Sequence, residues 1–203
     1  MHVGMSVIFQ NPGEEIPDQQ VYQQDLALAL QAEPLGFDSV WSVEHHFTSY
    51  TMCPDVLQFL TYMAGATKSV QLGSMVCVLP WHDPLRVIEQ ISMLDNLSGG
   101  RLILGLGRGT GKVEFDGFQT DMGSARLRFK ESTEMLLNAL ENGYAEYHGE
   151  LLDQPRVDIR PRPVKSMRGR AYAAAVSPDS ARIMAEMGVG ILIVPQKPWK
   201  AVR

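Results

Sequence analysis

Short apolar runs with alternating polarity recur along the chain, separated by segments with helical spacing. We predict strands over six of these runs, at residues 2–9, 39–43, 70–79, 101–106, 171–176 and 190–194. Helices are predicted at about residues 18–33, 55–67, 84–96, 125–141 and 178–187. Such strict alternation of strand and helix predicts an α/β fold whose strands are parallel and lie in sequential order.

Local signals mark several of the boundaries. Asp83-Pro84 and Ser177-Pro178 each place an N-cap residue before a proline at the first helical position, and glycines 99, 100 and 188 end helices. Two long segments, 107–124 and 143–170, are predicted to be irregular, and residues 156–170 of the second are expected to form an extended surface loop. Because an eight-stranded barrel typically takes ~250 residues, six strands predict an incomplete barrel.

Composition limits the classes of function. With 45% hydrophobic and 20% charged residues among 203, the chain can form one well-packed domain, which we expect to span residues 1–203 and to be short at its C-terminal end. The net charge of -5 and the scattered Lys and Arg argue against a nucleic acid or an anionic membrane as a partner. Two cysteines without zinc spacing, no signal peptide and no long apolar run predict a cytoplasmic protein.

The most informative segment is Glu44-His45-His46, at the end of an apolar strand. Parallel α/β enzymes place their chemistry at the carboxyl ends of strands, so these side chains are candidate catalytic residues. A satisfied loop histidine is an equally reasonable interpretation of either ring. A metal site formed by His45, His46 and His82 is disfavoured, because adjacent histidines are not a usual chelating pair, and we predict no metal.

Two further segments suggest a bound phosphate. The glycine-rich run at residues 105–112 matches neither a dinucleotide fingerprint nor a phosphate loop, but it contains Arg108 at the end of a strand. Ser177 and Ser180 open a helix, where backbone N–H groups favour anions, although plain N-capping explains the same residues. Because a parallel barrel brings these sites to one face, they indicate a phosphorylated planar cofactor.

The chain resembles the luciferase-like flavin monooxygenases over essentially its whole length. The resemblance rests on segments in the family's order, GFDSVWSVEHHF at 36–47, VLPWHDPLR at 78–86, LDNLSGGR at 94–101, GFQTDM at 117–122 and SAR at 124–126. It implies a (β/α)8-type barrel in which reduced FMN and O2 oxygenate a small organic substrate.

The resemblance also implies roles for single residues. His45 matches the histidine implicated in flavin-hydroperoxide chemistry, and Glu44 would hold its tautomer. Arg108, Ser177 and Ser180 match positions at the FMN phosphate. Met75-Val76 falls where the family often has a non-prolyl cis peptide beneath the isoalloxazine ring. Further residues that would line the cofactor are Gly107 and Val176.

Some positions depart from the family's pattern. A reactive cysteine of the luciferase α chain is replaced by Gly107, and a glutamate before the phosphate serine by Val176. A family histidine aligns with Asp83, with His82 adjacent. These changes argue against light emission and leave the substrate open.

His46 is expected to matter less than its neighbour. If His46 faces loop or solvent, replacing it should slow the reaction less than replacing His45.

Other functions and partners follow from the same resemblance. A deazaflavin-dependent oxidoreductase and a truncated, non-catalytic flavin-binding protein are the alternatives to an FMN-dependent monooxygenase. A separate reductase would supply the reduced FMN. A homodimer packed on the second and third helices is expected, because an apolar stripe exceeds what one barrel wall needs; its members are Leu57, Leu60, Met63, Val87, Ile88, Ile91, Leu94 and Leu97.

Overall fold

The structure, a computed structural model, describes residues 1–193. Its strands are β1 Gly4–Ser6, β2 Ser39–Ser42, β3 Gln71–Ser74, β4 Cys77–Val78, β5 Leu102–Gly107, β6 Tyr144–His148, β7 Asp153–Asp158, β8 Ala171–Ala175 and β9 Gly190–Ile193. Its helices are α1 Asp18–Ala29, α2 Val56–Ala66, α3 Pro84–Leu97, α4 Lys112–Gly117, α5 Ala125–Asn142 and α6 Pro178–Glu186, with a 3-10 turn, η1, at Leu79–Trp81. Residue 194, the predicted end of the last strand, lies outside this range.

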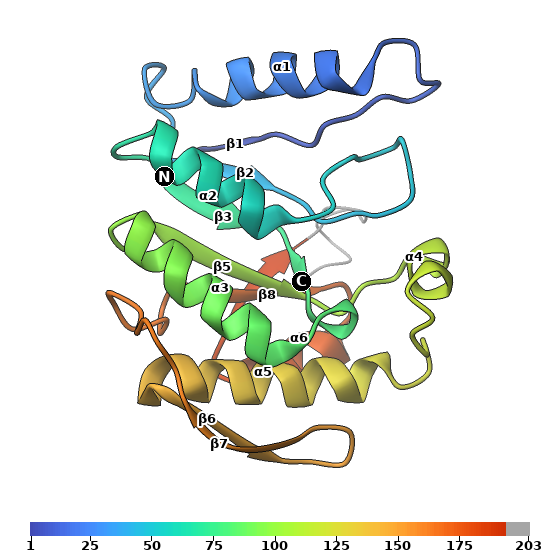
Figure 1. Ribbon diagram of the computed structural model, residues 1–203, viewed down its shortest axis with the longest axis vertical. Helices are drawn as coiled ribbons and strands as arrows, with labels where there is room; N and C mark the ends of the chain where they lie inside the picture. Colours follow the sequence, from blue (N-terminus) through green and yellow to red (C-terminus); the bar gives the residue numbers. More distant parts are fainter. Residues whose placement is uncertain (194–203) are drawn as a thin grey trace.

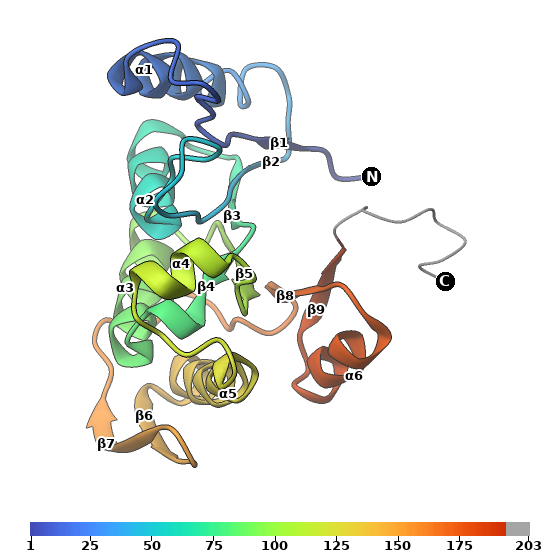
Figure 2. The same cartoon turned by 90° about the vertical axis from the view of Figure 1, so that its right-hand side faces the viewer.

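The main sheet is parallel and runs in sequential order, as the sequence predicts. Its strands follow the order β1-β2-β3-β5-β8-β9, and the short β4 pairs with β5. Helices α1, α2, α3 and α5 cover one side of the strands, and β8, β9 and α6 curve away to continue the curl (Figures 1 and 2). The result is a curled half-barrel, which confirms the predicted incomplete barrel.

The third predicted strand is interrupted. The Met75-Val76 peptide bond is cis, as the resemblance implies, and it divides the segment into β3 and β4. The chain then turns through η1 rather than remaining extended to residue 79. The predicted continuous strand at 70–79 is therefore wrong, because its apolar pattern fits a buried kinked segment as well as a straight strand.

Both segments predicted to be irregular contain regular structure. Helix α4 lies within 107–124, and β6 and β7 form an antiparallel hairpin within 143–170. The carboxylate of Glu131, on α5, accepts the backbone N–H groups of residues 150, 151 and 152 and so fixes the hairpin turn. Pro155 lies in β7, where a two-stranded hairpin leaves an unpaired edge that tolerates proline.

A buried ion pair joins α3 to the chain that leads into β8. Asp95 is fully buried, and its Oδ1 lies 2.5 Å from Nη1 of Arg170. Asp95 also accepts the backbone N–H of Val164, and Arg170 also donates to the carbonyl of Leu102 on β5. These bonds hold the start of β8 beside β5, which sets the position of the carboxyl end of β8.

The helix caps agree with the sequence. Asp83 accepts the backbone N–H of Arg86 at the start of α3, and Ser177 accepts that of Ser180 at the start of α6. Among the described residues, no helix is both long and apolar enough to cross a membrane.

The apolar stripe on α2 and α3 is used mostly within the chain. Seven of its eight members are buried in the core, namely Leu57, Leu60, Met63, Val87, Ile88, Ile91 and Leu94. Only Leu97 of the stripe is exposed, at 53%. The expected surplus of apolar surface is therefore wrong as an argument for a dimer.

A homodimer on this face stays a prediction, supported now by the exposed side chains of Tyr62, Met93 and Leu97. We expect a dimer in sedimentation velocity at micromolar concentration and a shift toward monomer on Met93→Glu with Leu97→Glu, because these changes place charge in an apolar contact. Leu28→Glu, at an exposed position of α1, is the matched control. A wild-type chain that sediments as a monomer contradicts the prediction.

Candidate functional site

The parallel strands bring the predicted site residues to one edge of the sheet. Glu44 and His45 follow β2, Arg108 follows β5, and Val176 and Ser177 follow β8. The pairing of Ser42 with Ser74 and of Leu106 with Ala173 aligns these strand ends, together with the Met75-Val76 bond that follows β3. The edge is therefore continuous from the histidines to the start of α6.

Glu44 is a buried carboxylate with three hydrogen-bond donors. Its Oε1 accepts from Nε2 of His82 at 2.6 Å and from Nε2 of His46 at 3.1 Å. Its Oε2 accepts the backbone N–H of Val78, on β4, at 2.9 Å. Glu44 thus links the end of β2 to β4 and to the turn before α3.

The same contacts shift two pKa values in opposite directions. Burial by itself would raise the pKa of Glu44, but the hydrogen bonds from His46 and His82 and the charge of His82 outweigh it, so that the pKa is lowered. Burial would lower the pKa of His82, but the hydrogen bond and charge of Glu44 outweigh it and the pKa is raised. Glu44 and His82 therefore behave as an ion pair.

His45 has a different carboxylate partner from the one expected. Its Nδ1 lies 2.8 Å from Oε1 of Glu114, on α4, and not against Glu44. The same oxygen accepts the backbone N–H of His46 at 3.2 Å. The expectation that Glu44 holds the tautomer of His45 is therefore wrong, because both oxygens of Glu44 already serve other donors.

His46 does not face solvent. Its ring packs edge-on against Trp81 and Phe118, with centroids 5.2 and 4.6 Å away. The side chain is 9% exposed and its Nε2 is bonded to Glu44. His46 is therefore part of the buried network, and its replacement is not a mild control for that of His45.

Close contact between strands makes glycine necessary on β5. A Cβ atom at Gly105 would lie 2.0 Å from the carbonyl oxygen of Ser74, and one at Gly107 would lie 2.2 Å from Cγ2 of Val76. Gly107 thus lets the kinked chain at Met75-Val76 cross the edge. Met75 and Val176 are exposed there, at 37% and 57%.

Arg108 and the two serines lie at the far end of this edge. Within residues 1–193, the Arg108 side chain has no hydrogen bond or ion pair, and it is half-buried. Ser177 and Ser180 form a reciprocal capping box, and Oγ of Ser180 accepts the backbone N–H groups of Val176 and Ser177. The serines therefore cap α6, while no residue among 1–193 forms a hydrogen bond or ion pair with the guanidinium.

Three side chains of the Glu44 network come within reach of a common metal ion. The ligand atoms of Glu44, Cys77 and His82 lie within 4.8 Å of one another. Burial raises the pKa of the Cys77 thiol well above its usual value, which disfavours the thiolate that a metal needs. We interpret the cluster as a hydrogen-bonded network, because both Glu44 oxygens are occupied by donors.

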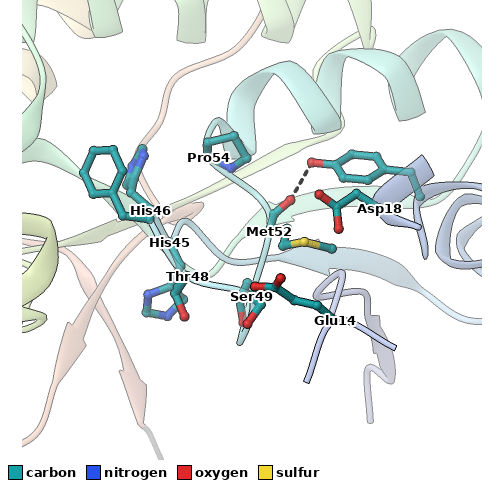
Figure 3. A pocket seen from close by; sticks show the side chains of 11 residues that line it. Glu14, Asp18, His45, His46, Thr48, Ser49, Met52 and Pro54 are labelled. Atoms are coloured by element: carbon teal, nitrogen blue, oxygen red, sulfur yellow. Dashed lines mark hydrogen bonds between the residues drawn. The ribbon is translucent and has the colours of Figure 1, made fainter. Parts of the chain in front are cut away.

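A cavity of about 490 Å³ opens beside His45. It is bounded by the segment that follows β2 and by Glu14, Asp18 and Tyr22 near the start of α1, where the Tyr22 hydroxyl donates to the Met52 carbonyl at 2.5 Å. Figure 3 shows the rings of His45 and His46 on opposite sides of the backbone. Both histidines contribute to the cavity lining, but only His46 is bonded to Glu44, and the ring of His45 is the more exposed of the two.

Sequence and structure comparisons place the chain among known proteins. Residues 1–203 match the model of the luciferase-like monooxygenase family. The chain belongs to this family. It is 29% identical over 174 residues to the alkanal monooxygenase alpha chain of Photorhabdus laumondii, covering 86% of this chain and 48% of that protein. It is 26% identical over 197 residues to the oxygenase component of the flavin-dependent trigonelline monooxygenase of Acinetobacter baylyi, covering 96% and 54%.

Solved structures of similar fold agree with the half-barrel. The monooxygenase RslO1 from Streptomyces bottropensis has a TM-score of 0.91 and 30% identity, covering 99% of this chain and 62% of that one. Two further structures show similarity of fold alone. The first is the oxygenating constituent of 3,6-diketocamphane monooxygenase from Pseudomonas putida in complex with FMN, at TM-score 0.81 and 19% identity, covering 95% of this chain and 57% of that one. The second is the coenzyme F420 dependent tetrahydromethanopterin reductase from Methanopyrus kandleri, at TM-score 0.72 and 22% identity, covering 95% of this chain and 55% of that one. The luciferase-like chain thus spans about half the length of the curated relatives named above.

Sequence reasoning missed Glu114 as a site residue. The segment that contains it was predicted to be irregular, and it lies 69 residues from His45. The available signal is an acidic residue, Glu114, between the apolar Val113 and Phe115, a few positions after a glycine-rich strand end. A buried acid in such a position needs a partner.

The Glu44–His82 pair predicts a pH-dependent contribution to stability. Because the pKa of His82 is raised above 6.5, the contribution of the charged His82 to stability is fully present below that pH. It is lost as the pH rises through the folded-state pKa. Because the pKa of Glu44 is lowered below 4.5, the contribution of the Glu44 carboxylate to stability is present above that pH and is lost as the pH falls through the folded-state pKa. His82→Gln should therefore lower the free energy of unfolding most between these values, by about 1–3 kcal/mol.

Urea unfolding at about pH 5.5 and about pH 9 measures this difference. His148→Gln is the matched control, because the His148–Asp153 pair is exposed on the hairpin and is expected to matter little. An equal loss of stability at both pH values for His82→Gln contradicts the prediction.

Proposed function

We propose that this luciferase-like chain binds reduced FMN at the carboxyl edge of its sheet and uses it with O2 to oxygenate a small organic substrate. The observation that carries the proposal is the placement of His45 and Arg108 on one continuous edge of parallel strands, with no partner for the Arg108 side chain among the described residues. Membership of the family supports it. A monooxygenase of known structure at 30% identity over nearly the whole chain supports it as well.

The residues at this edge fit a phosphorylated planar group. A half-buried guanidinium without an acidic partner among the described residues is suited to a phosphate, which it can bind through two hydrogen bonds. Ser177 and Ser180 would add hydroxyl contacts only by sharing them with the capping box, so Arg108 carries more of the proposed binding. The ring would lie along Met75, Val76 and Gly107, with Val176 at its border.

Protein groups near the ring would then position the substrate and handle protons. The flavin, when bound, supplies the activation of oxygen. His45 is 39% exposed, so its ring can reach a reacting group and hold or accept a proton at Nε2. Glu44 would act indirectly, without touching the substrate, because its hydrogen bonds to His46 and His82 hold the segments that flank the site.

Two related alternatives remain. Hydride transfer with a deazaflavin is favoured by the likeness in fold to a coenzyme F420 dependent reductase, and a spectrum with an anaerobic assay separates it from oxygenation. A chain that only binds flavin would bind FMN without turnover. In the leading proposal a separate flavin reductase supplies the reduced cofactor, in keeping with the oxygenase component that the trigonelline relative represents.

The phosphate placement predicts a loss of FMN affinity on Arg108→Ala. We expect the binding free energy to fall by about 1.5–3 kcal/mol, or roughly 10- to 150-fold in Kd, which is usual for a hydrogen bond to a charged group. Fluorescence titration with FMN measures this change. Arg156→Ala, on the β6–β7 hairpin, is the control for loss of one positive charge. An unchanged Kd for Arg108→Ala would falsify the placement.

The proton role of His45 predicts an effect on turnover and little effect on FMN retention. With reduced FMN, O2 and either an alkanal or trigonelline, His45→Ala should slow oxygenation by about 10²–10⁴-fold, the usual contribution of a positioned acid or base. Product formation and released hydrogen peroxide are measured together, so that uncoupled oxidation is recognised. His2→Ala, far from the edge, is the control. Wild-type rates in His45→Ala rule out the role.

A further inference from the structure

Glu114 is a buried carboxylate whose hydrogen bonds go to one short segment of the chain. Its side chain is 3% exposed, and Oε1 receives both Nδ1 of His45 and the backbone N–H of His46. Among the described residues, no other hydrogen bond or ion pair engages this carboxylate. Since a buried carboxylate is costly without donors, the contact with His45 is a built feature of the edge.

A second, independent observation concerns the space around this carboxylate. A Cβ atom at Gly111 would lie 1.9 Å from Oε2 of Glu114 and 2.8 Å from its Cδ. Gly111 has a φ of -77°, which any residue can adopt, so its backbone conformation does not require glycine. The missing side chain instead makes room for the carboxylate at the position where it meets His45.

We propose that Glu114 is the positioning residue for His45. Because Oε1 also receives the His46 N–H, it acts as an acceptor, so Nδ1 of His45 carries the proton when the ring is neutral. The ring is thereby held as the Nδ1–H tautomer, and Nε2 is left as the atom that accepts a proton. The catalytic consequence rests on the function proposed above, whereas the tautomer does not.

Glu44 cannot take this part, although it is the sequence neighbour of His45. Its oxygens are bonded to His46, His82 and the Val78 N–H. Each of the two carboxylates is thus bonded to the ring of a different histidine. Glu44 holds the buried ring of His46, and Glu114 holds the partly exposed ring of His45.

A purely structural role for Glu114 makes a different prediction. If the carboxylate only ties α4 to the segment after β2, its loss lowers stability without a defined change in the His45 ring. If it positions the ring, its loss releases Nδ1, and the ring reverts toward the Nε2–H tautomer that free histidine prefers. The ring nitrogens therefore report the positioning role directly.

The test is ¹⁵N NMR of histidine-labelled full-length protein above neutral pH, without flavin, with the His45 signals assigned by their absence in His45→Gln. We expect mainly the Nδ1–H tautomer in wild type, mainly Nε2–H in Glu114→Ala, and partial retention of Nδ1–H in Glu114→Gln, whose amide oxygen still accepts. Gly111→Ala displaces the carboxylate without removing it and should also shift the tautomer. Gly65→Ala is its control, because no atom lies within 4 Å of a Cβ added there.

The outcomes separate this proposal from the proposed function. A wild-type ring that is mainly Nε2–H, or one that stays Nδ1–H in both Glu114→Ala and Gly111→Ala, overturns the positioning role whether or not FMN binds. If Glu114→Ala does not fold, Gly111→Ala and Glu114→Gln give the answer. In the oxygenation assay, Glu114→Ala should lower kcat by at least about 10-fold at unchanged FMN affinity, and by no more than the roughly 10²–10⁴-fold expected for loss of the ring itself. A shifted tautomer with unchanged kcat overturns the catalytic part alone.

Discussion

The buried carboxylate of Glu44 is the constraint on which the arrangement of the site depends. A carboxylate removed from water must be met by donors, or it destabilises the fold by several kcal/mol. Here the donors come from the segment after β2, from β4 and from the turn before α3. Because these three segments must converge on one side chain, the edge of the half-barrel is fixed before any ligand is considered.

The same constraint separates the functions of two adjacent histidines. His46 is drawn inward by Glu44 and by the aromatic rings of Trp81 and Phe118. Its neighbour His45 lies on the other side of the backbone, beside the cavity (Figure 3). The Nδ1 atom of His45 meets the carboxylate of Glu114. Burial of one ring thus determines the exposure of the next.

The departures from the luciferase pattern have structural explanations in this chain. At the turn before α3, His82 donates to Glu44 and the adjacent Asp83 caps the helix, so the two neighbours have different structural roles. A cysteine at position 107 would collide with Val76, and glycine there allows the two strands to approach. Val176 places an exposed apolar side chain where the α chain has a glutamate, which makes the border of the proposed cofactor site less polar.

The sequence by itself determined the parallel order of the six strands, the capped starts of α3 and α6, and the group of residues at the strand ends. These follow from local periodicity, from N-cap and proline chemistry, and from the fact that parallel strands share a carboxyl edge. Only the tertiary structure decided that β3 and β4 are separate, that 143–170 contains a hairpin, and that Glu114 rather than Glu44 meets His45. The hairpin turn is stabilised by Glu131, and the His45 contact spans 69 residues, so both depend on where distant helices lie. Local patterns hold no information about such distances, because the partner of a buried charge is set by packing.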